Sequence, residues 1–197
     1  LKVAMKPDAI KDLAPGAPTL EGYLFPSTYR ITRHTSPERI CREMTAEFRR
    51  VWDEIGRTGV DVNRIVTLAS LVEKETAVPA ERTTVASVYQ NRLDLGMRLD
   101  ADPTTIYAAL LENRFRGTIY RSDLESTHAY NTYRNAGLPP GPIANPGRDS
   151  LRAALNPAQT GYLFFVAKPD GSGAHQFSTG LADHNLAVEQ YRRGLPK

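Results

Sequence analysis

The stretch from Asn63 to Ala77, NRIVTLASLVEKETA, decides how this chain is expected to fold. Its apolar residues recur every three to four positions, which is typical of an amphipathic helix with one face in a core. With Ile65 set to zero and about 100° per residue, Glu75 lies at about 280°. That position is inside the apolar stripe, between Leu71 at about 240° and Leu68 at about 300°. The helix therefore directs one carboxyl toward the protein interior.

Burial of this carboxyl allows two interpretations. A carboxylate in apolar surroundings is strongly disfavoured unless it is paired or protonated. A protonated Glu75 would suit general acid catalysis near neutral pH, because burial disfavours ionisation. Alternatively, Glu75 forms a structural ion pair at the helix end with an arginine such as Arg82 or Arg92. Glu73, at the edge of the stripe, is expected at the surface or behind the acid.

Capping and stop signals predict further helices on both sides of this stretch. Ser36 and Pro37 begin an amphipathic helix over 37–55, which Gly56 ends. Ser122 and Glu125 have the spacing of a capping box, which predicts a short helical turn. The other predicted helices cover residues 63–77, 80–95, 102–112, 149–155 and 181–193.

Two short apolar stretches near the carboxyl end predict a hairpin. Residues 162–167 and 175–178 favour strands, and the segment 169–173, PDGSG, favours the turn between them. Four prolines and three glycines in residues 137–147 indicate an extended loop. The predicted fold class is α+β, a helix-rich domain with a small antiparallel sheet formed by a hairpin at about 162–178.

Composition excludes several classes of protein. The 197 residues are 41% hydrophobic and 24% charged, which is typical of a globular domain. Cys41 is the single cysteine, so neither an internal disulfide nor a zinc site built from cysteines is available. A net charge of +3 gives no support for nucleic-acid binding. The sequence contains no run of about 18 apolar residues, the length that a helix needs to cross a bilayer.

Other catalytic designs receive little support from the sequence. The histidines His34, His128, His175 and His184 show no His-Glu-x-x-His spacing, and a zinc hydrolase would require His175 and His184 to meet in space. No Gly-x-Ser-x-Gly nucleophile elbow occurs. Cys41, on the 37–55 helix, is expected to be a small buried or half-buried thiol and not a nucleophile. We expect neither a metal nor a cofactor.

Ordered sequence blocks, covering about residues 20 to 191, carry a resemblance to a known family. They are LEGYLFPSTY at 20–29, EKETA at 73–77, ER at 81–82, VASVYQNRL at 85–93, GMRL at 96–99, DPT at 102–104, AYNTY at 129–133, GLPPGPIANPG at 137–147 and HQFSTGLADHN at 175–185. In this order they closely resemble the catalytic domain of the endolytic murein transglycosylases (the MltG or YceG-like family).

The resemblance implies roles for individual residues. It makes Glu75, the second glutamate of the EKET block, the catalytic acid and base. The substrate-binding residues are then expected to be Glu73, Asp102, Thr104, Tyr130, Asn131 and Tyr133, with the 137–147 loop lining further glycan subsites. Two of these have structural alternatives, since Asn131 could cap a helix start and Asp102 could be a helix N-cap.

Two arginines near these blocks also have a functional and a structural interpretation. Arg92 and Arg98 would receive carboxylates of the peptide that the substrate carries, or would pair with Asp94 and Asp100. The sequence does not decide between these two roles.

The implied function is a lyase that cleaves the β-1,4 bond from N-acetylmuramic acid to N-acetylglucosamine inside peptidoglycan strands. It would leave a 1,6-anhydro end without using water, and would thereby end the elongation of nascent strands. The alternative is a non-catalytic glycan-binding or scaffold module of the cell-wall synthesis machinery. Peptidoglycan strands, and with them cell-wall synthases, are the expected partners, and nucleic acid is not.

The resemblance also implies a cellular location. Family members have one N-terminal transmembrane helix and a LysM-like domain, and neither lies in this chain. We therefore expect residues 1–197 to be the catalytic domain of a truncated, soluble chain. In the complete protein, this domain would lie on the outer side of the cell membrane, held there by a single membrane span.

Overall fold

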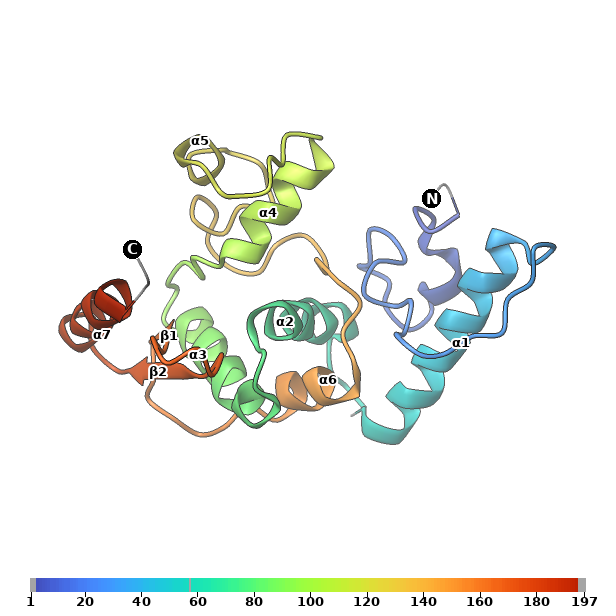
Figure 1. Cartoon of the computed structure of the whole chain (residues 1–197). Helices are drawn as coiled ribbons and strands as arrows, with labels where there is room; N and C mark the ends of the chain where they lie inside the picture. Colours follow the sequence, from blue (N-terminus) through green and yellow to red (C-terminus); the bar gives the residue numbers. More distant parts are fainter. Residues whose placement is uncertain (1–2, 57, 195–197) are drawn as a thin grey trace.

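The chain folds around three central helices that carry smaller groups of elements at their edges (Figure 1). The computed structural model describes residues 3–56 and 58–194. Its helices are α1 (Pro37–Ile55), α2 (Val62–Glu75), α3 (Arg82–Asp94), α4 (Asp102–Leu111), α5 (Arg121–Leu124), α6 (Arg148–Leu155) and α7 (Leu181–Gly194), with 3-10 turns at Pro7–Ile10 and Pro79–Glu81. The strands are β1 (Phe164–Ala167) and β2 (His175–Ser178).

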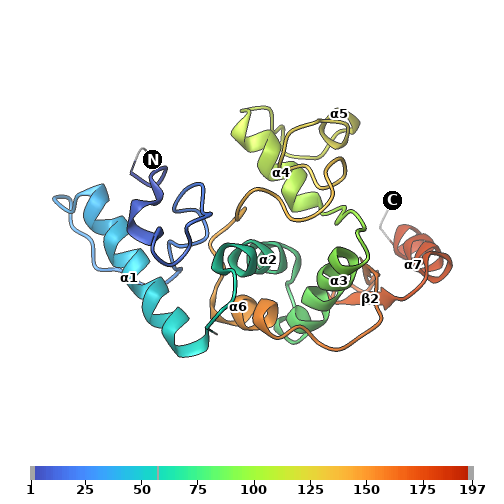
Figure 2. The same cartoon turned by 180° about the vertical axis from the view of Figure 1, so that it is seen from behind.

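Helix α2 is the central element. It packs against α3, α4 and α6, while α7 packs against both strands of the hairpin. Helix α1 and the loop-rich amino-terminal segment lie at one end of the molecule, and α7 with the hairpin lies at the other (Figures 1 and 2). The predicted fold class, helix-rich α+β with a small antiparallel sheet, is confirmed.

The ends of α1 and α2 follow from local signals. The Ser36 hydroxyl accepts a hydrogen bond from the amide of Arg39 at 3.3 Å, and α1 begins at the predicted residue. Helix α2 ends at Glu75, two residues before the predicted end, because the chain becomes extended on its way to Pro79. A residue before a proline disfavours helical geometry, and Val78 has a ψ of 111°. Glu75 is thereby the last helical residue of α2.

The hairpin has the predicted position with a shorter first strand. Phe164 pairs with Ser178 and Ala167 with His175 in antiparallel register. The predicted strand began at Tyr162, whose carbonyl instead accepts a hydrogen bond from the side chain of Asn91 at 2.9 Å. A side chain of α3 therefore takes the place of a strand partner at this point.

The short helix α5 differs from its predicted cap. The sequence pattern placed Ser122 and Glu125 in a capping box, whereas the helix begins one residue before Ser122. The Asp123 carboxylate accepts the amide of Tyr120 at 2.9 Å and also pairs with Arg114 at 2.6 Å. Asp123 is buried, so the tertiary ion pair selects it as the capping group.

The core joins α2 to every layer around it. Tyr23, Phe48 and Trp52 form an aromatic group between the amino-terminal segment and α1, with the Tyr23 and Phe48 ring centroids 5.1 Å apart. Further fully buried side chains from α2, α3 and α6 are Val66, Leu68, Leu71, Val72, Val85, Tyr89 and Leu151. The apolar stripe predicted for α2, which includes Leu68, Leu71 and Val72, is buried, so this side of the helix faces the interior.

Candidate active site

Glu75 occupies the position that the helical periodicity predicted, on the inner side of α2 at its last residue. Its Oε1 accepts a hydrogen bond from the hydroxyl of Tyr89 at 3.1 Å. Among the residues that the structure describes, Glu75 forms no ion pair with Arg82, Arg92 or any other cation. The interpretation as a structural ion pair is therefore wrong.

The environment of Glu75 favours its protonated form. Burial raises its pKa from the ordinary 4.5 to about 7, and the negative charge of Asp102 acts in the same direction. The hydrogen bond from Tyr89 opposes this shift by stabilising the carboxylate. A carboxyl with such a pKa has both protonation states available near neutral pH, so it can donate a proton and later accept one.

Helix α3 supplies the support behind this acid. Tyr89 is buried, and its ring packs edge-on against Phe165 with centroids 5.9 Å apart. Asn91 donates to the carbonyls of Thr160 and Tyr162, at 2.8 and 2.9 Å. These bonds hold the chain that enters β1, so one helix positions both the partner of Glu75 and a wall of the site.

Asp102 and Tyr133 form a second hydrogen-bonded pair near the acid. The Tyr133 hydroxyl donates to Asp102 Oδ1 at 2.7 Å, which joins the first turn of α4 to the 129–135 loop. Burial and the Asp102 charge raise the pKa of Tyr133, so its hydroxyl remains protonated. Asp102 is the first residue of α4 and Ala101 is the N-cap, so the N-cap alternative for Asp102 is wrong.

These residues face one cavity of about 790 Å³. Its walls are formed by α2, α3, the start of α4, β1 and α7. The residues lining it are Glu75, Tyr89, Arg92, Leu99, Asp100, Asp102, Tyr133, Phe164, Phe165, Val166, Leu181, His184, Asn185, Val188, Tyr191 and Arg192. Of the seven predicted site residues, Glu75, Asp102 and Tyr133 therefore meet in a single cavity of ligand-binding size.

Glu73 has a different environment from Glu75, although the two residues are only two positions apart on α2. Its Oε2 accepts hydrogen bonds from the amide of Gly147 at 3.1 Å and from the hydroxyl of Ser150 at 2.6 Å. Both donors lie at the amino end of α6, where a carboxylate stabilises the free amides and the helix dipole. Glu73 joins α2 to α6 and does not line the cavity, so its predicted contact with substrate has no support in this geometry.

Thr104 and Asn131 are both fully buried. The Thr104 hydroxyl donates to the Ala101 carbonyl at 2.7 Å and bonds to Thr132. The Asn131 amide donates to three backbone carbonyls, those of Asp123, Leu124 and Ser126. Both side chains therefore organise the loop beneath Tyr133, and neither faces the cavity. Asn131 caps no helix start.

Tyr130 lies in another group of side chains. Its ring packs against Tyr107, with centroids 4.9 Å apart, and against His128. Burial and the nearby charge of Glu21 raise the pKa of Tyr130. This aromatic group faces the amino-terminal segment and is not part of the cavity around Glu75.

The 137–147 loop fastens the amino-terminal segment to α2. The Asn145 side chain accepts the amides of Gly22 and Leu24, at 2.8 and 3.2 Å, while Ser70 accepts the amide of Ile143 at 3.0 Å. Gly22 has a φ of +89°, and a Cβ there would lie 2.4 Å from Pro142. Close backbone approach explains why a glycine stands in the first sequence block.

The histidines that could have formed a metal site each contact a different partner. His175 bonds to Glu81 at 2.8 Å, and His184 stacks on Phe164 with centroids 5.1 Å apart. Within residues 3–56 and 58–194, no group of three or more potential ligands could hold a metal ion. Cys41 is half-buried and unpaired on α1, as predicted.

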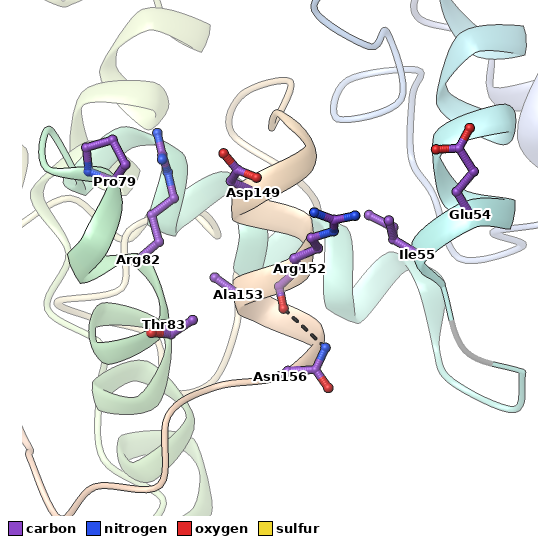
Figure 3. A pocket seen from close by; sticks show the side chains of 9 residues that line it. All are labelled: Glu54, Ile55, Pro79, Arg82, Thr83, Asp149, Arg152, Ala153 and Asn156. Atoms are coloured by element: carbon purple, nitrogen blue, oxygen red, sulfur yellow. Dashed lines mark hydrogen bonds between the residues drawn. The ribbon is translucent and has the colours of Figure 1, made fainter.

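A second hollow, of about 460 Å³, lies between the end of α1, the start of α3 and α6 (Figure 3). Its lining includes Glu54, Arg82, Asp149 and Arg152, so both signs of charge face it. It contains none of the predicted site residues. Glu54 is already paired with Arg148 at 2.6 Å, and the hollow presents no acid in an apolar wall.

Sequence reasoning did not identify the role of Tyr89 or the face of α7. A buried tyrosine hydroxyl generally needs a partner, so the central position of Tyr89 in the 85–93 block was an available signal. The α7 residues were visible only as part of the last block, 175–185, because nothing in the sequence shows which face of that helix meets the cavity.

Comparisons with known proteins place the chain in one family. The model of the YceG-like family matches residues 2–190. An endolytic murein transglycosylase of Bacillus subtilis (strain 168) is 42% identical over 177 residues, which cover 87% of this chain and 48% of the relative. One of Streptococcus pneumoniae (serotype 2, strain D39) is 34% identical over 178 residues, covering 87% and 32%. The chain thus spans about half the length, or less, of these relatives.

A solved structure has the same fold. The crystal structure of a YceG-like protein from Listeria monocytogenes aligns with a TM-score of 0.79 at 35% identity. The alignment covers 94% of this chain and 65% of that one. The arrangement of helices and hairpin described above is therefore shared with a relative of substantial sequence identity.

Proposed function

The chain belongs to the YceG-like family, as its sequence blocks predicted, and from this premise we propose that it is a lytic endotransglycosylase of peptidoglycan. The substrate is the β-1,4 bond between N-acetylmuramic acid and N-acetylglucosamine inside a glycan strand. The observation that carries the proposal is Glu75, a carboxyl with a pKa of about 7 in the wall of a cavity of about 790 Å³. The curated relatives named above are endolytic murein transglycosylases.

Glu75 is the only catalytic group that the proposed reaction requires. In its acid form it donates a proton to the glycosidic oxygen, and the bond from that oxygen to the muramyl C1 breaks. The C6 hydroxyl of the same sugar then attacks C1, and its proton passes to the Glu75 carboxylate. The product has a 1,6-anhydro ring, no water is consumed, and Glu75 returns to its acid form.

The surrounding residues support these two proton transfers. Tyr89 holds the Glu75 carboxyl in place and stabilises its ionised state after the first step. Asp102 opposes that ionisation, so the two contacts together keep both forms accessible. The internal attack by the C6 hydroxyl benefits from the fixed geometry of a bound strand, because no second molecule has to be positioned.

A digest of purified, uncrosslinked glycan strands, read by mass spectrometry, tests the proposal. Wild-type protein is expected to give products with anhydromuramic acid ends, one water lighter than hydrolysis products. Glu75→Gln keeps the side-chain shape, removes the acid and should give no products. Reducing ends in the wild-type digest would identify a hydrolase and contradict the internal attack.

The non-catalytic alternative makes a different prediction for the same pair of proteins. A glycan-binding or scaffold module would release no products from wild-type protein, and Glu75→Gln would bind strands equally well. The raised pKa of Glu75 argues against this alternative, because a binding site has no need of a carboxyl that is partly protonated near neutral pH.

We further propose that the complete protein acts outside the cell membrane, beside cell-wall synthases, and ends the elongation of nascent strands. In that complete protein, a single N-terminal membrane span and a LysM-like domain would precede residues 1–197. No helix in the described part of the chain is long and apolar enough to cross a membrane. Fractionation of cells that produce the full-length protein, and co-purification with synthases, test this placement. Recovery away from the membrane would refute it.

A further inference from the structure

The wall of the cavity formed by α7 differs in character from the wall that carries Glu75. On the Glu75 side, each carboxylate already has a protein partner: Glu75 has Tyr89, Asp102 has Tyr133, and Asp100 has Arg92. On the α7 side, the residues facing the cavity follow one helical stripe at positions 181, 184, 185, 188, 191 and 192. Four of these six residues are polar.

Among the described residues, the polar atoms of this stripe have no hydrogen-bond or ion-pair partners. Within the described part of the chain, the side chains of Asn185, Tyr191 and Arg192 form neither hydrogen bonds nor ion pairs. The Nδ1 atom of His184 is buried and also lacks a partner. Ala187 is the one buried residue of α7 among those described and lies outside this stripe, in which His184 packs on Phe164 while Asn185 and Arg192 are exposed. A concave surface with several unused donors is suited to a polar ligand.

Arg192 is a cation on this wall that forms no ion pair with any described residue, so it can receive an anion. Arg92 lines the same cavity, but its Nε donates to the Leu163 carbonyl at 2.6 Å and its Nη1 to the Leu99 carbonyl at 3.0 Å. Its guanidinium also lies 5.0 Å from the centre of the Phe164 ring. Arg92 therefore serves to hold β1, and the predicted role of receiving a substrate carboxylate is left to another residue.

Neither Arg98 nor His184 provides a positive charge for an anionic ligand in this cavity. Arg98 does not line the cavity and lies 3.9 Å from Asp100. Burial and the nearby Arg92 lower the pKa of His184, so its ring is uncharged near neutral pH. The neutral ring stacks on Phe164, so it joins the α7 wall of the cavity to β1.

We propose that the α7 wall binds the peptide carried by muramic acid, with Arg192 pairing with a peptide carboxylate and Asn185 with a peptide amide. The proposal rests on the proposed function, since it names the part of the same substrate that lies against α7. A guanidinium suits a carboxylate because its planar donors match both oxygens. The acidic residues near Glu75 would repel such a carboxylate, which leaves the α7 end of the cavity as its place.

The test compares two ligands on a protein that cannot cleave them. In the Glu75→Gln background, calorimetric titration measures the affinity for a tetrasaccharide of alternating N-acetylglucosamine and N-acetylmuramic acid, with and without its peptides. Arg192→Ala is expected to weaken binding of the peptide-bearing ligand about tenfold relative to the peptide-free ligand, which equals about 1.4 kcal/mol. Added salt should reduce this difference, because the pair is partly exposed.

Arg193→Ala is the matched control. Arg193 is the next residue of α7, carries the same charge and pairs with Glu189 at 3.2 Å, but does not line the cavity. Its removal should leave the ratio of the two affinities unchanged. Equal ratios for the Arg192 and Arg193 variants would overturn the proposal, as would failure of the Glu75→Gln protein to bind the peptide-bearing ligand.

The proposed function fails by a separate readout. Absence of anhydro ends in the wild-type digest refutes the transglycosylase activity and leaves the measured affinity ratio intact. A normal digest combined with an affinity ratio that Arg192→Ala does not change refutes the peptide subsite alone.

Discussion

Replacing Glu75 by glutamine is expected to remove a pH dependence from the folding stability of this protein. The carboxyl has an ordinary pKa of 4.5 and a pKa of about 7 in the folded chain. The folded state therefore holds this proton more tightly than the unfolded state does. The stabilisation is fully present below about pH 4.5 and is lost as the pH rises through about 7.

The size of the effect follows from the two pKa values. A difference of about 2.5 units corresponds to about 3 kcal/mol, lost between about pH 4 and pH 8. Glutamine keeps the oxygen that accepts the Tyr89 hydroxyl and carries no charge at any pH. The variant should therefore gain stability relative to wild type as the pH rises, by about 3 kcal/mol over this range.

Urea unfolding of both proteins at a series of pH values measures this difference. Subtracting one free energy of unfolding from the other cancels the titration of all groups that the substitution does not affect. If the free energy of unfolding falls with urea concentration at the same slope for both proteins, the two unfolding reactions expose similar surface and can be compared. A difference that stays constant from pH 4 to pH 8 would refute the assignment of Glu75 as a carboxyl held near neutrality by burial. The measurement needs no substrate, so it stands apart from the proposed activity.

Three further predictions test the supporting residues. Tyr89→Phe removes the hydrogen bond that stabilises the Glu75 carboxylate, so the pKa of Glu75 should rise. The alkaline limb of the pH–activity profile should then shift to higher pH by about one unit. A limb at the wild-type pH would contradict this role of Tyr89. Glu73→Ala leaves the Ser150 hydroxyl and the Gly147 amide without an acceptor, and should lower the free energy of unfolding by about 2 kcal/mol. The KM for glycan strands should stay the same. A raised KM would show that Glu73 contacts the substrate. Asn131→Ala leaves the carbonyls of Leu124 and Ser126 without their donor, while the carbonyl of Asp123 keeps the amide of Ser126, and it should cost about 3 kcal/mol in urea unfolding; a loss below about 1 kcal/mol would show that the loop does not depend on Asn131.

The local structure of this chain was largely predictable. Helical periodicity and end signals placed α1 at 37–55 and most of α2, because proline, glycine and capping residues act over one turn of chain. The same periodicity identified Glu75, since a helix of known face shows which carboxyl points inward. The sequence blocks identified the family, which the family model then matched over residues 2–190.

The functions of the other site residues were less predictable. Asp102 and Tyr133 reach the cavity as expected, whereas Glu73, Thr104, Tyr130 and Asn131 do not line it. A block shared with a family includes both residues that contact a ligand and residues that hold the backbone. Sequence alone does not separate these two groups, because the identity of a residue does not show whether its side chain is buried or faces a ligand.

The sequence by itself determined the helices, the hairpin, the family and the inward carboxyl, because each depends on neighbours within a few residues or on recognisable blocks. Only the tertiary structure decided what surrounds that carboxyl. Tyr89 lies 14 residues from Glu75 along the chain, and the α7 stripe begins more than a hundred residues after it. The pKa of Glu75 and the place of the Arg192 guanidinium in the cavity wall depend on distances between such segments, and those distances arise only when the helices pack around α2.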